Sequence, residues 1–254
     1  MTQFSANLGF LWTEKSLPEA IYNAKQAGFD AVECHWPYEV KAHDVIDALK
    51  ETSMEMLGLN TSRGNVVDGD NGLAAVPGRE SEARLYIDES VDYAASIGAR
   101  NIHIMAGFSQ GEESHKQFVE NLRYAVKKVA NLPVSLVIEP LNRYDAPDYF
   151  LSTTLQAEEI IKEIANDKLK LMFDCYHVQL MQGNLSRLFS HHLDIIGHVQ
   201  FASVPDRGPP DSGEVNYAYL FDYMHKLGYG QPLGAEYKPV GNTEDSLSWI
   251  GELR

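Results

Sequence analysis

Four polar residues with oxygen-bearing side chains end short apolar runs in the second half of the chain. Glu139 ends "SLVIE", Asp174 ends "LKLMFD", Gln200 ends "GHVQ" and Glu236 ends "LGAE". If these runs are neighbouring strands of a parallel barrel, all four side chains reach one mouth. Helix capping or solvent exposure could explain any one of them, but less readily all four, because unpaired carboxylates are rarely buried. Oxygen-only ligation suits a hard divalent ion, Mg²⁺ or Mn²⁺.

A hard ion at this mouth could bind two adjacent oxygens of a hydroxy-carbonyl compound and polarise its carbonyl. A carboxylate could then remove the neighbouring proton to give an enediolate, and reprotonation at the next carbon would move the carbonyl. Glu139 and Glu236 are the natural pair for this acid–base work. The chain has no nucleophilic serine elbow, Walker loop or thiolate zinc motif.

Further polar residues lie near the ends of the apolar runs. His177 follows Asp174 by three residues, and Arg207 lies in the loop after Gln200. Arg207 could bind a substrate carboxylate or phosphate through its two-pronged guanidinium, or pair with its sequence neighbours Asp206 or Asp211. Any single histidine is more often a satisfied structural residue than a ligand. The remaining candidates are His35, His103, His198 and Asp145.

Eight apolar runs alternate with segments of helical periodicity, and the junctions repeat the order helix end, glycine, strand. One such helix, "TTLQAEEIIKEIAN", has Ser152 or Thr153 as its N-cap. Eight strand–helix units in 254 residues predict a single-domain α/β protein with the (β/α)₈ barrel fold over residues 1–254. An open doubly wound sheet is the alternative, although no GxGxxG follows the first strand. The predicted strands are Phe4–Phe10, Ala31–Trp36, Met54–Leu59, Asn101–Met105, Val134–Glu139, Leu169–Asp174, Ile195–Phe201 and Gly234–Tyr237.

Two connections are longer than the rest, Asn60–Arg79 and Ala202–Asn216. Long loops in a compact domain are usually functional or disordered. Both follow predicted strands, so in a barrel both would cover the active face.

Composition further restricts the expected partners and cellular location of the protein. The formal net charge of −15 opposes binding to phosphate backbones, so we expect no nucleic-acid partner. Cys34 and Cys175 form no CxxC pair and are expected to be buried free thiols in a reducing compartment. No signal peptide and no apolar stretch of roughly 20 residues is found, so we expect a cytoplasmic protein without a membrane partner.

Four motifs resemble the hydroxypyruvate isomerase family: "IEPLNRYD", "FDCYH", "GHVQFASVPDRGPPDSGEVNY" and "GAEYKP", in this order and spacing. The segment "NTSRGN…GDNGLAAVPGRE" also resembles this family's long loop after the third strand. The family belongs to the xylose isomerase-like TIM barrels, which include ketose 3-epimerases and an endonuclease branch. The resemblance covers nearly the whole chain.

The resemblance implies roles for the candidate residues. His177 and Arg207 match substrate-contacting positions, whereas Asp145 matches a position where ketose epimerases carry a glutamate one carbon longer. The epimerases usually have histidine where this chain has Gln200, which points to the hydroxypyruvate isomerase side. The implied metal ligands are Glu139, Asp174, Gln200 and Glu236, of which Glu139 and Glu236 match the pair that moves the proton.

The implied reaction is reversible isomerisation of hydroxypyruvate to tartronate semialdehyde. The alternatives are an oxo-tetronate (phosphate) isomerase, a ketose 3-epimerase and a non-catalytic barrel that binds a sugar acid. The endonuclease branch needs several more metal-binding histidines and a basic DNA face. Barrels of this kind often pair, so a homodimer and a homotetramer both stay open. Substrate length is expected to depend on the Asn60–Arg79 loop and on His35, Trp36, Phe108 and Trp12.

Overall fold

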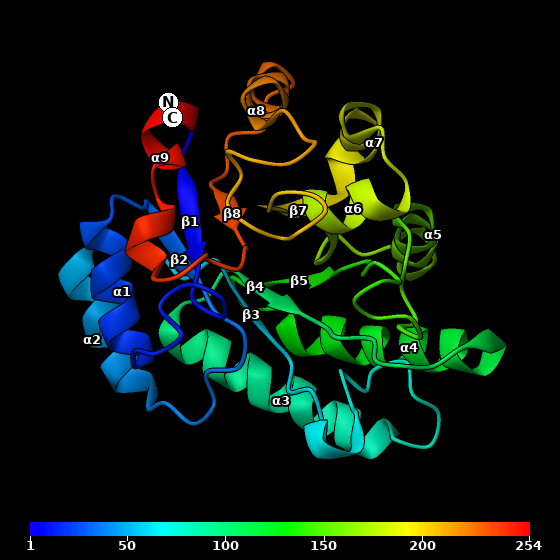
Figure 1. Ribbon diagram of the computed structural model, residues 1–254. Coiled ribbons are helices and arrows are strands. Elements are labelled where there is room, and N and C mark those ends of the chain that lie inside the picture. Colours follow the sequence, from blue (N-terminus) through cyan, green and yellow to red (C-terminus); the bar gives the residue numbers. More distant parts are fainter.

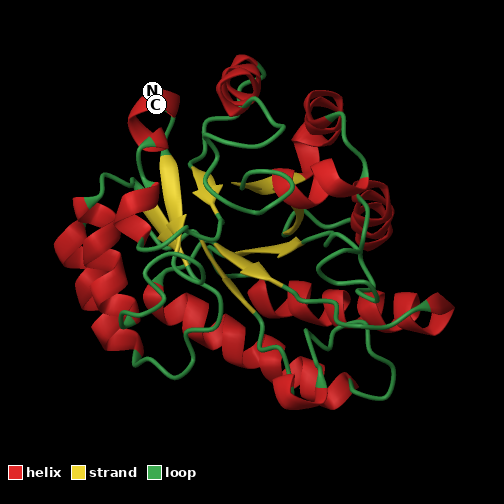
Figure 2. Ribbon diagram, in the orientation of Figure 1, coloured by secondary structure: helices red, strands yellow, loops and turns green.

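Eight parallel strands occupy the centre of the molecule, and helices surround them as a ring (Figures 1 and 2). The structure is a computed structural model that describes residues 1–254. The strands are β1 Phe4–Asn7, β2 Ala31–Glu33, β3 Gly58–Asn60, β4 Asn101–His103, β5 Ser135–Ile138, β6 Leu169–Asp174, β7 Ile196–Phe201 and β8 Leu233–Ala235.

The sheet closes on itself. Its hydrogen-bonded order is β2-β1-β8-β7-β6-β5-β4-β3, so β2 and β3 are the two ends. The ends are joined by the bonds Val32 N–H to Glu55 O (3.0 Å), Leu57 N–H to Val32 O (2.7 Å) and Cys34 N–H to Gly58 O (3.0 Å). A closed ring of eight parallel strands confirms the predicted (β/α)₈ barrel and excludes the open doubly wound sheet.

Nine α-helices and three short 3₁₀ turns connect and flank the strands. In α1 the side chain of Ser16 and that of Glu19 cap each other's backbone, and Ala20, Ile21 and Ala24 form the buried stripe. The helices are α1 Leu17–Gln26, α2 Ala42–Thr52, α3 Glu80–Ile97, α4 Gly111–Val129, α5 Thr154–Ile164, α6 Cys175–Met181, α7 Leu185–His192, α8 Tyr217–Lys226 and α9 Trp249–Leu253; the turns are η1 Val66–Asp68, η2 Leu193–Ile195 and η3 Thr243–Ser246.

Most strands are shorter than the apolar runs predicted. Only Leu169–Asp174 has the predicted bounds. The first strand, for example, ends at Asn7 although Leu8 and Leu11 beyond it are also buried. Buried positions favour apolar residues whether or not their backbone takes part in the hydrogen bonds of the sheet. The apolar runs in the sequence therefore overestimate the length of the strands. Glu139 and Glu236 accordingly lie one residue beyond β5 and β8. For α5 the N-cap is Thr153, which accepts from Gln156 N–H.

The core lies between the barrel and the outer helices. The indole of Trp249 in α9 packs against Phe4 of β1 (5.0 Å between ring centroids) and Phe201 of β7 (5.4 Å). This contact holds the C-terminal helix beside the first strand, and the two termini lie together in Figure 1. Trp12 also belongs to this core, where it packs on Phe29. Trp12 is buried, and its role in substrate length stays a prediction.

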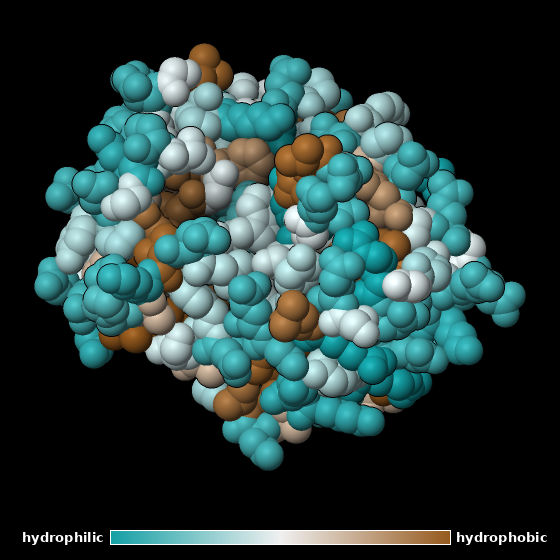
Figure 3. Space-filling view, turned by 90° about the horizontal axis from the view of Figure 1, so that it is seen from below, coloured by the Kyte–Doolittle hydropathy of each residue, from teal (hydrophilic) through white to brown (hydrophobic).

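Charged and polar side chains cover most of the face seen in Figure 3, and hydrophobic residues occur there in small, separate groups. Cys34 and Cys175 are free and buried, as predicted. No helix has the length and apolar character needed to cross a membrane.

Candidate active site

The structure brings the four predicted strand-end residues together at the carboxyl mouth of the barrel. Glu139 follows β5, Asp174 ends β6, Gln200 lies in β7 and Glu236 follows β8. Asp174 and Gln200 are direct partners in the β6–β7 register. All four side chains are buried, although none is apolar. The cluster must therefore be held by hydrogen bonds, ion pairs or a ligand.

Three of the four residues have a buried oxygen without any hydrogen-bond partner. These atoms are Glu139 Oε1, Asp174 Oδ2 and Gln200 Oε1. Helix capping accounts only for the other oxygen of Asp174, Oδ1, which accepts from Tyr176 N–H at the start of α6 (2.8 Å). Ligand atoms of Glu139, Asp174 and His177 lie within 4.8 Å of one another. Free oxygens on neighbouring strands are the donor set that a hard divalent cation requires.

Glu236 is the residue of the four with the most partners. Its Oε1 accepts from Asn7 Nδ2 (2.9 Å) and lies 3.0 Å from His35 Nε2, while its Oε2 forms an ion pair with Arg207. Burial would raise the pKa of Glu236, but the Arg207 guanidinium and the His35 contact hold it well below its usual range. Gly9 makes room for this arrangement, since a Cβ there would lie 2.1 Å from the His35 ring.

The other two carboxyl groups have the opposite electrostatic character. Burial and the charge of Glu236 raise the pKa of Asp174 to about 7. Burial, followed by the charges of Glu236 and Asp174, raises the pKa of Glu139 well above its ordinary value. The positive charge that the protein places near Asp174 and Glu139 is therefore too small to offset their burial and the repulsion from neighbouring carboxylates. A bound cation would supply it.

His177 faces the same cluster, and its tautomer is fixed by Asn142. The Nδ1 atom of His177 lies 3.0 Å from the backbone N–H of Asn142 and 2.7 Å from its Nδ2. Asn142 Oδ1 accepts from the backbone N–H groups of Tyr144 and Asp145, so Nδ2 must be the donor to His177. Because Nδ1 accepts, the ring proton is on Nε2.

The Nε2–H of His177 points to the carboxylates, with Asp174 Oδ2 at 3.6 Å and Glu139 Oε1 at 3.8 Å. Burial, together with the Arg207 charge, lowers the pKa of His177 to about 3, so the ring is neutral. A protonated Nε2 cannot ligate a metal. His177 is instead a hydrogen-bond donor toward the space between the carboxylates.

Arg207 enters the site from the Ala202–Asn216 loop. Its guanidinium lies between the rings of Phe10 and Tyr176, 4.8 and 5.0 Å from their centroids, and 3.7 Å from Asp174. The residue has φ of 54°, a conformation that costs about 1 to 2 kcal/mol outside glycine. The predicted alternative, a pair with Asp206 or Asp211, is wrong: the acidic partners are Glu236, Asp174 and the more distant Asp145.

Asp145 lies at the rim rather than in the carboxylate cluster. Its Oδ2 accepts from Asn142 Nδ2 and from the Tyr176 hydroxyl, both at 2.9 Å, and is 4.0 Å from Arg207 Nη1. Asp145 thus contacts the residues that hold His177 and Arg207.

Three polar residues from the first half of the chain complete the site. His103 was a candidate from the sequence, whereas Asn7 and Glu33 were not. Asn7 bonds Glu236, and Glu33 accepts from Gln200 Nε2 at 2.7 Å. His103 lies 3.5 Å from Glu139, and neither of its ring nitrogens has a partner. All three end a strand, which is the same signal that identified Asp174.

The predicted substrate-length residues other than Trp12 lie around the mouth. His35 contacts Glu236, and Trp36 beside it donates to Thr61 O (3.1 Å) at the start of the Asn60–Arg79 loop. The Arg63 guanidinium of this loop lies 4.9 Å from the Trp36 ring. Phe108 packs on Tyr149 and is exposed.

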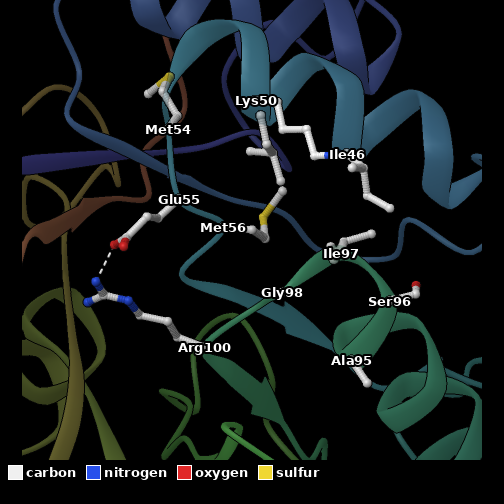
Figure 4. Close-up of a pocket in the computed structure, with 11 residues that line it drawn as sticks. Ile46, Lys50, Met54, Glu55, Met56, Ala95, Ser96, Ile97, Gly98 and Arg100 are labelled. Carbon is white, nitrogen blue, oxygen red and sulfur yellow. Dashed lines mark hydrogen bonds and ion pairs between the residues drawn. The ribbon is translucent and has the colours of Figure 1, made fainter.

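A separate pocket of about 610 Å³ lies at the other end of the barrel, beside the amino ends of β3 and β4 (Figure 4). Residues of α2 and α3 line it, and the Glu55–Arg100 ion pair borders it. None of the candidate active-site residues lines this pocket. The amino end of such barrels generally serves stability rather than catalysis.

Known proteins resemble the chain from end to end. The family model described as xylose isomerase-like TIM barrel matches residues 21–253. Hydroxypyruvate isomerase of Escherichia coli is 37% identical over 100% of both chains, and 2-oxo-tetronate isomerase of Cupriavidus necator is 37% identical over 98% of each. A crystal structure titled "AP endonuclease, family 2", from Brucella melitensis, is 36% identical over 100% of both chains, with a TM-score of 0.96.

Proposed function

The chain belongs to the hydroxypyruvate isomerase family of the xylose isomerase-like TIM barrels, and we propose that it is a metal-dependent isomerase that interconverts hydroxypyruvate and tartronate semialdehyde. Isomerisation of small hydroxy-keto acids agrees with the names of its full-length relatives. The observation that carries the metal dependence is the set of three buried, unpartnered oxygens on Glu139, Asp174 and Gln200.

These three residues and Glu236 would hold the ion, and their oxygen-only donor set favours Mg²⁺ or Mn²⁺. When bound, the ion would polarise the substrate carbonyl and stabilise the negative charge that develops on its oxygen.

The protein's own residues bind and orient the substrate. Arg207 carries a fixed positive charge beside the carboxylates, so we assign it to the substrate carboxylate. The Nε2–H of His177 donates toward a substrate oxygen between Asp174 and Glu139. Asp145 holds Tyr176 and Asn142 in place around these two groups, and His35 supports Glu236.

Glu139 and Glu236 are the proposed acid–base pair. One carboxylate removes a proton from C3 of hydroxypyruvate, which gives an enediolate, and a proton returns to C2. The hydroxyl proton moves from O3 to O2, so the product is tartronate semialdehyde and no atom is gained or lost. In the metal-free protein burial and the neighbouring carboxylates raise the pKa of Glu139, whereas Arg207 keeps Glu236 ionised.

A 2-oxo-tetronate is the second candidate substrate, because the relative named for it matches at the same identity as the hydroxypyruvate isomerase. It has the same hydroxy-carbonyl unit, so the chemistry would be unchanged. DNA is a poorer candidate despite the name of the solved relative, since the net charge of −15 opposes a phosphate backbone. We place the protein in the cytoplasm, where its two free cysteines would stay reduced.

The test is an NMR assay in D₂O with chelator-treated protein, with and without Mg²⁺ or Mn²⁺. Hydroxypyruvate and 2-oxo-tetronates are compared side by side, and a DNA duplex with an abasic site serves as the endonuclease control. Metal-dependent formation of tartronate semialdehyde, with deuterium at C2, supports the proposal. Turnover without a divalent ion, or turnover of neither hydroxy-keto acid, would contradict it.

A further inference from the structure

We propose that Glu33 is a positioning residue that turns the amide of Gln200 so that its carbonyl oxygen faces the metal site. The inference rests on the metal role proposed for Gln200. Glu33 ends β2, which β1 and β8 separate from β7, and it contacts none of the other three proposed ligands by hydrogen bond.

The two ends of the Gln200 side chain have different surroundings. Its Nε2 donates to Glu33 Oε2 (2.7 Å) and lies 3.3 Å from Glu236 Oε1. Its Oε1 is buried and has no partner. A primary amide has two N–H donors, and here two carboxylates receive them. Rotating the amide would set its oxygen against both carboxylates, so these two groups fix the orientation.

Glu33 is itself held firmly in the barrel interior. Its Oε1 accepts from the Ser5 hydroxyl (2.7 Å), and His198 Nε2 lies 3.1 Å from Oε2. His198 precedes Gln200 by two residues in β7, so both side chains point into the barrel. Glu33 is only 3% exposed. A buried carboxylate held by three polar partners is costly to place, which indicates a specific use.

Gly234 of β8 keeps open the space that Glu33 needs. A Cβ at this position would lie 2.2 Å from Glu33 Oε1 and 2.9 Å from His198 Nε2. The backbone of Gly234 is ordinary strand, so a glycine is needed here for space alone. A side chain at position 234 would displace the carboxylate and remove the acceptor of the Gln200 amide.

The experiment compares the Mn²⁺ affinities of variants at position 33. Affinity is measured on chelator-treated protein by the loss of the free-ion EPR signal. E33M removes the acceptor of Gln200, and we expect it to weaken Mn²⁺ binding by roughly 10- to 100-fold, as other residues that orient ligands do. E33Q still offers an amide oxygen to Gln200, while Ser5 can accept its N–H, so its affinity stays within a few-fold. S5A is the matched control, since it removes a hydrogen bond from the other oxygen of Glu33.

A second substitution separates orientation from general structural damage. In E33M/Q200E the carboxylate at position 200 presents an oxygen whichever way it rotates, so we expect most of the lost affinity to return. If E33M fails to fold by circular dichroism, E33D replaces it, because its shorter side chain withdraws the acceptor by one methylene.

The outcomes separate the two proposals. Absence of Mn²⁺ binding to the wild type would overturn the proposed metal role, and this inference with it. Wild-type affinity in E33M or in its substitute E33D would overturn the inference alone. So would a folded E33M/Q200E that binds no better than E33M, because a misoriented amide would then not be the cause.

Discussion

Asn142 donates two hydrogen bonds to Nδ1 of His177 and thereby decides that this histidine presents an N–H to the carboxylate cluster. One of the two donors is the Asn142 backbone and the other its side chain, while the side-chain oxygen closes a turn with Tyr144 and Asp145. Asn142 is not a proposed metal ligand, but its two hydrogen bonds make His177 a hydrogen-bond donor in the pocket. Without it, His177 could as well ligate a metal with Glu139 and Asp174.

The relationship predicts the effect of N142D. The aspartate retains the turn, because a carboxylate oxygen can accept from both backbone N–H groups, but it replaces the donor to Nδ1 by an acceptor. Because the backbone N–H of residue 142 still donates to Nδ1, we expect the Nδ1–H tautomer to be populated only in part and kcat/KM to fall by up to roughly tenfold, the value of one substrate hydrogen bond of about 1.4 kcal/mol. Nitrogen-15 NMR of the imidazole reports the tautomer directly. An unchanged tautomer together with an unchanged rate would show that Asn142 has no such role.

Glu139 is expected to be indispensable for turnover. E139Q keeps the size of the side chain but removes a base that can take a proton, so the rate should fall by roughly 10² or more. The exposed Glu159 of α5 has no hydrogen-bond partner, and E159Q is the matched control for losing one negative charge. Rates and Mn²⁺ affinity are measured on both variants. Full activity in E139Q would refute the proposed mechanism.

Metal loading is expected to stabilise the fold. The cation would supply charge for two carboxyl groups whose pKa values burial raises, and would satisfy the unpartnered oxygens. At 100 times Kd this linkage contributes about 2.7 kcal/mol. For a chain of this size each kcal/mol raises Tm by about 2 to 4 °C. Differential scanning calorimetry with EDTA or Mn²⁺ should show the shift, and D174N should abolish it.

The same carboxyl groups make the metal affinity depend on pH. Burial and Glu236 raise the pKa of Asp174 to about 7, so in the metal-free protein this group is largely protonated at pH 6 and largely ionised at pH 8. Only the ionised form binds a cation. The affinity for Mn²⁺ should therefore rise from pH 6 to pH 8, and calorimetry at pH 6 in two buffers of different ionisation enthalpy should detect proton release. A flat profile would contradict the raised pKa.

The sequence predicted the barrel and the four strand-end residues because both follow from local patterns. Parallel strands point one way, so an acid at the end of each apolar run must reach the same mouth. The contacts across the barrel could not be predicted in this way. Glu33 and Gln200 are 167 positions apart and lie on strands that are not neighbours in the sheet.

Arg207 shows the same limit within one loop. Its nearest acids in the sequence are Asp206 and Asp211, but the positive φ of 54° directs its side chain into the mouth, to Glu236 and Asp174. Backbone conformation in a loop depends on tertiary contacts, here the bonds from Arg207 N–H to Ser203 O and from Lys238 N–H to Arg207 O. Composition and spacing therefore identified Arg207 as a candidate site residue, but they could not predict its ion-pair partners.

The position of Arg207 predicts that a positive charge alone will not replace it. R207K keeps the charge, but lysine lacks the planar guanidinium that lies between Phe10 and Tyr176 and can bind a carboxylate through two parallel N–H bonds. We expect KM for hydroxypyruvate to rise roughly tenfold or more, since one charge-assisted hydrogen bond is worth about 1.5 to 3 kcal/mol. R187K, at an exposed position of α7, is the matched control and should leave KM unchanged. If R207K bound hydroxypyruvate as tightly as the wild type, the substrate carboxylate would have to be bound elsewhere, and Arg63 beside Trp36 would be the next residue to replace.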